Sequence, residues 1–210
     1  MKNSFIYKTI IISTLMAIII KVLIIEIYNV PSESMENTLL KGDRIVVFKI
    51  LNFGLKSSKE KEFFIRKLNK PRRNDVIVFL HPNEDKIYVK RCIGLPMDSI
   101  LLLNTDIYIN RQHFKRPING RLNYPYSSSN DSNRLMSTGN SFVNQRERDS
   151  VVINVPKFQY YMLGDNMKGS YDSRYWGFVP EKNIIGKAKL ILFNFRNGKF
   201  QWNRFFKRIQ

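Results

Sequence analysis

The most constraining feature of the sequence is a long apolar run close to its N-terminus. Residues Thr9 to Ile25 include one charged side chain, that of Lys21. A helix that crosses the hydrocarbon core of a bilayer needs about 20 mainly apolar residues. Extended to Phe5 or Tyr28, the run reaches that length and predicts a transmembrane helix, with Lys21 close enough to one end for its amine to reach the interface.

Positive charges before the run predict its orientation. Lys2 and Lys8 precede it, and basic residues beside a first span favour the cytoplasmic side. We interpret residues 1–29 as a cytoplasmic N-terminus and a single-pass anchor in the cytoplasmic (inner) membrane, with the rest of the chain on the outer side. Two other interpretations stay open. One is a cleaved signal peptide, with Ser32-Glu33-Ser34 as a small-x-small site; the other is a core helix, which is expected to show a polar stripe.

After the apolar run, the pattern changes to the two-residue period of β-strands. Short β-branched and aromatic runs bounded by Gly, Pro, Asn and Asp lie at 44–48, 75–80, 87–93, 106–110, 151–155 and 190–195. Asn197-Gly198 predicts a two-residue hairpin turn between strands 190–196 and 199–204. The sequence therefore predicts a mainly β fold, in which a transmembrane helix is followed by an antiparallel β-sheet domain.

Two segments interrupt the strand pattern. Residues 55–73 are rich in Lys and Arg, and residues 121–149 are dense in Ser, Asn and Arg. The second segment is typical of a long surface excursion. We therefore divide the exported part into a main β domain, at 30–101 and 151–210, and a small inserted β subdomain at 102–150.

The charge and the rare residue types limit the classes of function. The 210 residues include 35 Lys and Arg against 17 Asp and Glu, a net charge of +18 that suits nucleic acid, anionic lipid or an acidic polymer. The single Cys92 cannot form an internal disulfide and is expected to be a small buried core residue. His81 and His113 are too isolated for a metal site. We expect neither a metal nor a cofactor.

One lysine has the setting of a general base. A serine hydroxyl attacks a carbonyl when a neighbouring base takes its proton, and neither histidine has a suitable setting. Lys90 would share a strand face with Tyr88 and Cys92, among weakly polar or apolar neighbours. Because burial disfavours the ammonium form, it would lower the pKa of this amine. Lys90 is therefore a candidate base.

Several motifs follow one another in a specific order. After the apolar run come Ser32-Glu33-Ser34-Met35 with Thr38-Leu39, Gly42-Asp43, the strand at 75–79, Lys90-Arg91 with Gly94-Leu95-Pro96, Gly164-Asp165-Asn166, and Asp172 to Pro180. With this ordered set the chain resembles the bacterial type I signal peptidases (leader peptidases). These are membrane-anchored Ser-Lys proteases that release signal peptides from exported proteins.

The resemblance implies a role for each matching residue. Ser34 would be the nucleophile and Lys90 the general base, and Ser32 would form the oxyanion hole with the Ser34 backbone N–H. Ser170 would hydrogen-bond the Lys90 amine. The supporting residues would be Arg91 paired with Asp165, together with Asp172 and Arg174. The walls of shallow pockets for small substrate side chains would include Val30, Pro31, Tyr88 and Val89. Trp176 and Phe178 are expected to pack beneath the site.

The sequence departs from the family pattern in two places. Met167-Lys168-Gly169 stands where the family usually has Arg-Asp-Asn, and Asn74 stands where a glycine usually precedes the third strand. Because asparagine tolerates the left-handed backbone conformation better than other non-glycine residues, the turn at Asn74 is expected to survive.

The resulting hypothesis is a membrane-bound serine endopeptidase that cleaves preprotein signal peptides after small-x-small motifs. Its second partner would be membrane lipid, contacted by the aromatic and basic residues at 202–208, and no nucleic acid is expected. The alternative is a membrane-tethered basic protein that binds nucleic acid or an anionic polymer through 59–70 and the C-terminal tail, with steep salt dependence. A self-cleaving Ser-Lys repressor-type protease would need a DNA-binding domain where the apolar run stands.

Overall fold

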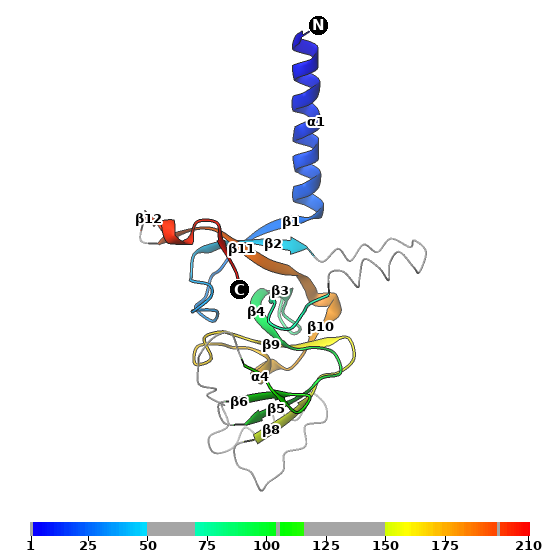
Figure 1. Cartoon of the computed structure of the whole chain (residues 1–210), viewed down its shortest axis with the longest axis vertical. Helices are drawn as coiled ribbons and strands as arrows, with labels where there is room; N and C mark the ends of the chain where they lie inside the picture. Colours follow the sequence, from blue (N-terminus) through cyan, green and yellow to red (C-terminus); the bar gives the residue numbers. More distant parts are fainter. Residues whose placement is uncertain (1, 50–69, 104–105, 116–149, 197) are drawn as a thin grey trace, which may run out of the picture.

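A single helix projects from a β domain (Figure 1). The structure is a computed structural model, and it describes residues 2–49, 70–103, 106–115, 150–196 and 198–210. The helix is α1 (Lys2–Leu23). The strands of the main antiparallel sheet are β1 (Ile25–Asn29), β2 (Asp43–Lys49), β3 (Val76–Leu80), β4 (Ile87–Gly94), β9 (Gln159–Leu163), β10 (Val179–Pro180), β11 (Ile184–Arg196), β12 (Lys199–Phe200) and β13 (Lys207–Arg208).

The long strand β11 organises the main sheet. The strand order is β1-β2-β11-β3-β4-β9-β10, and β12 and β13 pair with β11 off this path. The register of β11 shifts between Ala188 and Leu190 and between Ile191 and Phe193 against β2, and between Ile184 and Gly186 against β3. Such irregularities bend a strand and increase its twist. β11 can therefore pair with four strands while the sheet curls.

Core residues cover both faces of this sheet, because successive strand residues point to opposite faces. Val76 and Val78 of β3 belong to a buried cluster with Met35 and Leu39 from the turn between β1 and β2. Ile77 and Phe79 belong to a second cluster on the other face, with Cys92, Tyr160, Met162, Trp176, Val179 and Ile184. The predicted burial of Cys92 is thus confirmed.

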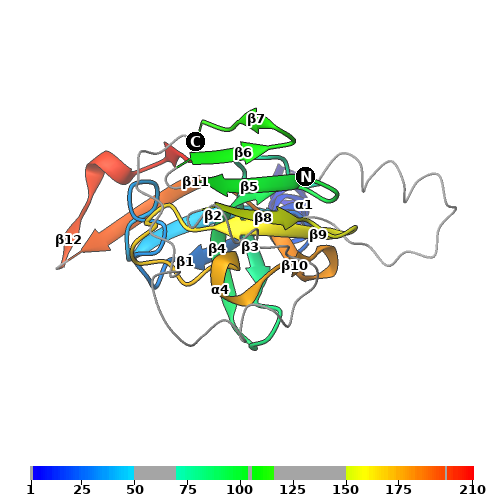
Figure 2. The ribbon, with the colours of Figure 1, turned by 90° about the horizontal axis from the view of Figure 1, so that it is seen from below.

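A smaller sheet lies at the end of the domain opposite α1 (Figures 1 and 2). Its strands are β5 (Ser99–Leu103), β6 (Asp106–Ile109), β7 (Gln112–His113) and β8 (Ser150–Asn154), in the order β7-β6-β5-β8. Ile100, Leu102 and Ile107 of this sheet share a buried cluster with Tyr161 and Leu163 of β9. The small sheet therefore begins and ends a few residues outside the predicted limits of 102–150, and it is packed onto the main sheet.

The described residues confirm a mainly β chain and change the limits of some predicted elements. The helix ends at Leu23, and residues 25–29, predicted to belong to the anchor segment, form β1, whose residues pair with β2 from Ile25↔Phe48 to Asn29↔Arg44. The physical reason is the alternation of β-branched and polar residues from Ile25 onward, which suits a strand. The segments 55–69 and 121–149 lie outside the described residues.

The turn before β3 and the hairpin between β11 and β12 were both predicted. Asn74 has φ of 71°, which confirms the left-handed turn before β3. Arg196 pairs with Lys199, which leaves the predicted two-residue loop between β11 and β12; Asn197 lies outside the described residues, and Gly198 has φ of 72°. The second arm is shorter than predicted, because residues 202–204 form the 3₁₀ helix η2 (Trp202–Arg204).

Among the residues whose side chains are described, no helix has both the length and the apolar content that a membrane span requires.

We expect Gly94→Ala to loosen the junction of the two sheets. A Cβ atom at Gly94 would lie 2.5 Å from Ile100 Cδ1, 2.8 Å from Tyr161 Cβ and 2.9 Å from Val155 Cγ2. Overpacking of this kind costs about 1–3 kcal/mol of unfolding free energy. Denaturant unfolding of the chain in detergent measures the loss. Ser99→Ala changes a nearby exposed side chain and should stay within about 0.5 kcal/mol; equal stability of the two variants would contradict the expected crowding.

Candidate active site

The turn between β1 and β2 holds Ser34 at the edge of the core. Val30 N–H donates to Asp43 O at 2.9 Å and Gly42 N–H donates to Val30 O at 2.8 Å, so the two ends of the turn are closed against each other. Met35, next to Ser34, is buried in the core. Because Met35 is anchored in the core, the backbone at Ser34 is held beside it. Of the Ser34 residue, 6% is exposed.

Lys90 meets Ser34 from the middle of β4. Its Nζ lies 2.5 Å from Ser34 Oγ, and 2% of the residue is exposed. Burial lowers the pKa of the Lys90 amine from its ordinary value to about 8. The charge of Arg174 lowers this pKa further, whereas Asp172 and Asp165 raise it. A hydroxyl beside a buried amine of lowered pKa can give its proton to that amine, which is the first requirement of nucleophilic chemistry.

The two other predicted serines lie near the pair and differ in their contacts. Ser32 Oγ lies 3.2 Å from Ser34 Oγ. Ser170 is buried, but among the described atoms its Oγ has no hydrogen-bond partner, so the predicted bond to the Lys90 amine is not formed. The Ser170 side chain packs over Gly164 instead, where an added Cβ would lie 2.0 Å from Ser170 Oγ and 2.5 Å from Ser34 O.

The predicted pair of Arg91 and Asp165 is present and buried. Arg91 Nε and Nη2 donate to the two carboxylate oxygens of Asp165, each at 2.8 Å. Arg91 Nη2 also donates to Thr38 Oγ1 at 3.0 Å, and Asn166 N–H donates to Ser34 O at 3.0 Å. The ion pair therefore joins β4, the Ser34 turn and the segment after β9.

Asp172 and Arg174 hold the loop that leads from β9 to α4 (Ser173–Trp176). Arg174 Nε donates to Asp172 Oδ1 at 2.8 Å, and Arg174 Nη2 donates to Met167 O at 3.0 Å and Ser170 O at 3.3 Å. Asp172 Oδ2 accepts from Gly164 N–H at 2.9 Å. Because these bonds close the loop on itself, Gly164 and Ser170 stay beside Ser34.

The predicted pocket residues come from the Ser34 turn and from β4, where Tyr88 shares a strand face with Lys90 and the adjoining Val89 lies on the other face. Val30 is part of a core cluster against which Val89 packs, and Pro31 is exposed. Lys90 Nζ lies 5.7 Å from the centre of the Tyr88 ring. Within the described part of the chain, residues 87–90 pair with β3 alone, because pairing with β9 starts at Arg91. One edge of β4 is thus open beside Lys90.

The aromatic residues Trp176 and Phe178 pack as expected, and Trp176 contacts the ring of His81. Trp176 is buried against Phe79 and His81, and Phe178 packs against the core cluster below the small sheet. The His81 ring lies 4.8 Å from the Tyr88 ring, centre to centre. No pattern in the sequence indicates this position.

Two further residues have no predicted role. Asn166 hydrogen-bonds the Ser34 backbone, and Thr38 accepts a hydrogen bond from Arg91. Asn166 lies within the Gly164-Asp165-Asn166 motif and Thr38 within the Ser34 motif. Motif membership was therefore the available signal for these two residues. Among the described residues, no group of three or more His, Cys, Asp or Glu side chains could hold a metal ion; the absence of a cofactor stays a prediction.

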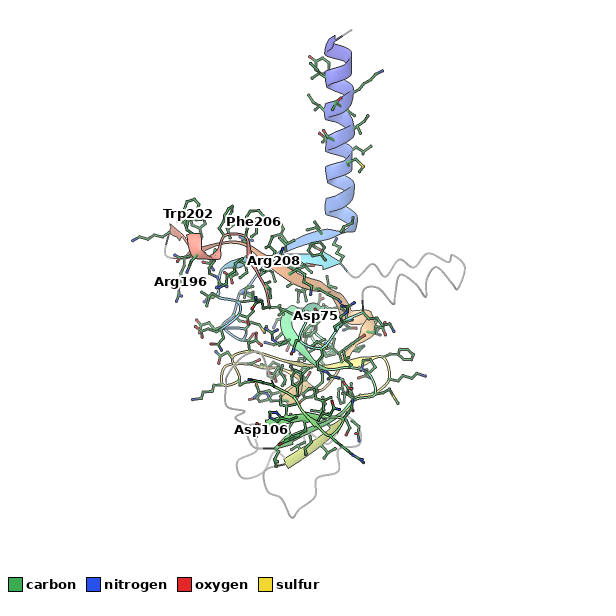
Figure 3. All side chains as sticks on the ribbon, in the orientation of Figure 1. Asp75, Asp106, Arg196, Trp202, Phe206 and Arg208 are labelled. Atoms are coloured by element: carbon green, nitrogen blue, oxygen red, sulfur yellow. The ribbon has the colours of Figure 1, made fainter. Side chains whose placement is uncertain are left out.

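A row of aromatic rings lies at the end of the domain from which α1 projects. We call it the aromatic edge, and it consists of Phe195, Phe200, Trp202, Phe205 and Phe206. Neighbouring rings contact one another, for example Phe200 and Trp202 at 4.6 Å between centres. Trp202 is 77% exposed. Figure 3 places Trp202, Phe206 and the basic Arg196 and Arg208 at this end, and Asp106 at the opposite end.

Comparisons with known proteins agree on one family. The family described as signal peptidase, peptidase S26, matches residues 4–193. A signal peptidase I from Buchnera aphidicola subsp. Baizongia pistaciae is 35% identical over 236 residues, which cover 88% of this chain and 74% of the relative. A signal peptidase I from Rickettsia typhi is 35% identical over 200 residues, covering 85% of this chain and 75% of the relative. A crystal structure of a signal peptidase I from Enterococcus faecalis V583 has 29% identity and a TM-score of 0.39, and the match covers 56% of this chain and 96% of that chain.

The chain belongs to the signal peptidase family, peptidase S26. It is accordingly a hydrolase, a serine peptidase of the signal peptidase I type, and its substrates are the signal peptides of preproteins. Membership of this family favours the peptidase hypothesis over the basic binding protein that the charge alone allowed.

We expect Asp165→Ala to destabilise the chain strongly, because it leaves the buried Arg91 guanidinium without its partner. Breaking a buried ion pair from one side costs about 3–5 kcal/mol. The free energy of unfolding, measured with denaturant in detergent, tests this. Asp106→Ala removes a carboxylate from an exposed pair with His113 and should cost about 0–1 kcal/mol. Similar losses in the two variants would show that Asp165 is not a structural support.

Proposed function

We propose that this peptidase cleaves signal peptides with a Ser-Lys dyad, in which Ser34 is the nucleophile and Lys90 the general base. The observation that carries the proposal is the 2.5 Å separation of Ser34 Oγ from the buried Lys90 Nζ. The lowered pKa of Lys90, about 8, supports it further, because a substantial fraction of the amine is neutral near neutral pH. An ordinary lysine would be almost wholly protonated there.

The reaction follows from the positions of these groups. Neutral Lys90 accepts the Ser34 proton while Ser34 Oγ bonds to the scissile carbonyl carbon. The Ser34 backbone N–H and the Ser32 hydroxyl stabilise the oxyanion of the tetrahedral intermediate. When the C–N bond breaks, Lys90 returns its proton to the departing amine and an acyl-enzyme remains. Lys90 then takes a proton from water, whose oxygen attacks the ester carbonyl carbon. As the bond from that carbon to Ser34 Oγ breaks, Lys90 gives the proton to Ser34 Oγ, so that the free hydroxyl and the neutral amine are restored.

The substrate would bind as an extended strand along the open edge of β4. Residues 87–90 of β4 pair with β3 on one side, and their other edge is available for main-chain hydrogen bonds beside Lys90. Tyr88 and Val89, with Val30 and Pro31 across from them, would form shallow pockets that admit small side chains. This arrangement accounts for cleavage after small-x-small motifs.

The membrane would hold the enzyme at two places. The apolar run Thr9–Ile25 supports an anchor that ends where α1 ends, with the β domain on the outer side of the cytoplasmic membrane. The aromatic edge lies at the same end of the domain as α1, and its residues are next in the sequence to four exposed cations, Arg196, Lys199, Lys207 and Arg208; Figure 3 shows two of them, Arg196 and Arg208, at this end. Exposed aromatic rings flanked by cations suit the headgroup region of an anionic leaflet.

We expect Ser34→Ala and Lys90→Met each to lower the cleavage rate of a preprotein by a factor of about 10³ or more. The first change removes the hydroxyl and the second the amine, and the mechanism requires both groups. Cleavage is followed by the appearance of mature protein, with each variant in detergent and its fold checked by its thermal unfolding. Lys182→Met changes an exposed lysine just beyond the last motif; it is the matched control and should keep full activity. Activity near that of the control in either variant would exclude the dyad.

The pKa of Lys90 sets the expected pH dependence. Because the neutral amine is the active form and its pKa is about 8, kcat/KM should rise about tenfold per pH unit below 8 and level off above it. Initial rates on a peptide substrate from pH 6 to 9.5 measure the profile. A flat profile over this range, or a midpoint near the ordinary lysine value, would contradict the role of Lys90.

A further inference from the structure

One arginine beside the rings of the aromatic edge points into the domain. Arg204 lies in η2 between the exposed Trp202 and Phe205, yet its side chain is buried. Its Nε donates to Asp43 Oδ1 at 2.8 Å, and its Nη2 donates to Asp43 Oδ2. Asp43 is fully buried and begins β2 directly after the Ser34 turn. A two-pronged, charge-assisted contact of this kind fixes position as well as charge.

Asp43 in turn holds the end of the Ser34 turn. Its Oδ2 accepts from Leu40 N–H at 2.8 Å. Asn194 of β11 donates through Nδ2 to Asp43 Oδ1 at 2.7 Å and to Lys41 O at 3.2 Å. The carboxylate is therefore shared by the turn itself, by the central strand and by η2.

Arg204 also contacts the turn directly, at Thr38. Its Nη2 donates to Thr38 O at 3.1 Å, while Arg91 Nη2 donates to Thr38 Oγ1 at 3.0 Å. Thr38 N–H donates to Met35 O at 3.0 Å, which closes the backbone around the residue next to Ser34. Two guanidinium groups thus fix one residue of the turn. Arg91 follows Lys90 in β4, and Arg204 lies in η2, between Trp202 and Phe205 of the aromatic edge.

We propose that Arg204 is a positioning residue for Ser34, through which contact of the aromatic edge with anionic lipid orders the Ser34 turn. The inference rests on the proposed function, because it needs Ser34 as the nucleophile and the aromatic edge as the lipid contact. Lipid that immobilises Trp202, Phe205 and Phe206 also immobilises η2, and the Arg204 guanidinium carries that restraint to Asp43 and Thr38. Because a misplacement of about 1 Å can cost about 10² in rate, the restraint acts on catalysis.

The coupling is tested without reference to activity by hydrogen–deuterium exchange of the full chain. Exchange is compared between neutral detergent micelles and vesicles of phosphatidylcholine with phosphatidylglycerol. In the wild-type chain, vesicles should slow exchange at 199–208 and at 31–43. In Arg204→Met, vesicles should still slow exchange at 199–208, but exchange at 31–43 should be faster than in the wild type and unaffected by vesicles.

Two further variants complete the exchange experiment. Arg111→Met removes an exposed cation from the turn between β6 and β7 in the small sheet, outside the proposed lipid contact, and should behave as the wild type at 31–43. The double change Phe205→Ser with Phe206→Ser alters two exposed rings and leaves Arg204 in place. It should abolish the vesicle effect at both segments, and it keeps the test decisive if Arg204→Met does not fold.

Kinetics separates positioning from general stability. Arg204→Met should lower kcat about tenfold or more with little change in KM, because the Tyr88 and Val89 walls are untouched. Arg204→Lys keeps the charge but loses the planar fork, so it should restore part of kcat. Arg111→Met should keep the wild-type kcat in detergent.

The outcomes distinguish the two proposals. If vesicles leave 199–208 unchanged in the wild type, the lipid contact in the proposed function is wrong and this inference falls with it. If vesicles protect 199–208 while 31–43 exchanges equally in the wild type and in Arg204→Met, the coupling alone is overturned. Equal losses of kcat in Arg204→Met and Arg111→Met would overturn the positioning role.

Discussion

The burial of one amine is the constraint on which the rest of the site depends. An ammonium group at the position of Lys90 loses nearly all of its hydration, since 2% of the residue is exposed. The carboxylates of Asp165 and Asp172 would favour that charge, but Arg91 and Arg174 bind them in bidentate contacts. The supporting ion pairs thereby serve two purposes. They join the segments around Ser34, and they keep the nearby negative charge from restoring the ordinary pKa of Lys90.

The sheet makes this burial possible. β4 lies between β3 and β9, and core clusters cover both faces of the curled sheet. Lys90 therefore projects from a strand whose backbone is paired with β3 at residues 87–91 and with β9 from Arg91 onward. The change from paired to open edge occurs beside the reactive amine. The proposed base and the edge proposed for the substrate thus lie on the same strand.

The sequence allowed the fold class and the central pair to be predicted, because both depend on local patterns. The strand period located β2, β3, β4 and β8 to within a residue or two, and the apolar setting of Lys90 pointed to its burial. Long-range contacts were less accessible. The pairing of β1 with β2 was hidden within an apolar run, and the role of Arg204 depends on Asp43, which lies 161 positions away. The hydrogen bond expected between Ser170 and Lys90 failed for a similar reason, because side-chain packing over Gly164 decides where that hydroxyl lies.

Gly164 has a consequence for when the enzyme becomes active. The glycine allows the segment after β9 to lie against the backbone of Ser34, and Asn166 in that segment bonds the Ser34 turn across 133 positions of chain. Ser34 and Lys90 are themselves 56 positions apart. These distant partners are brought together by the folded sheet. A chain in which the sheet is still incomplete therefore lacks the arrangement of Ser34, Lys90 and their supports.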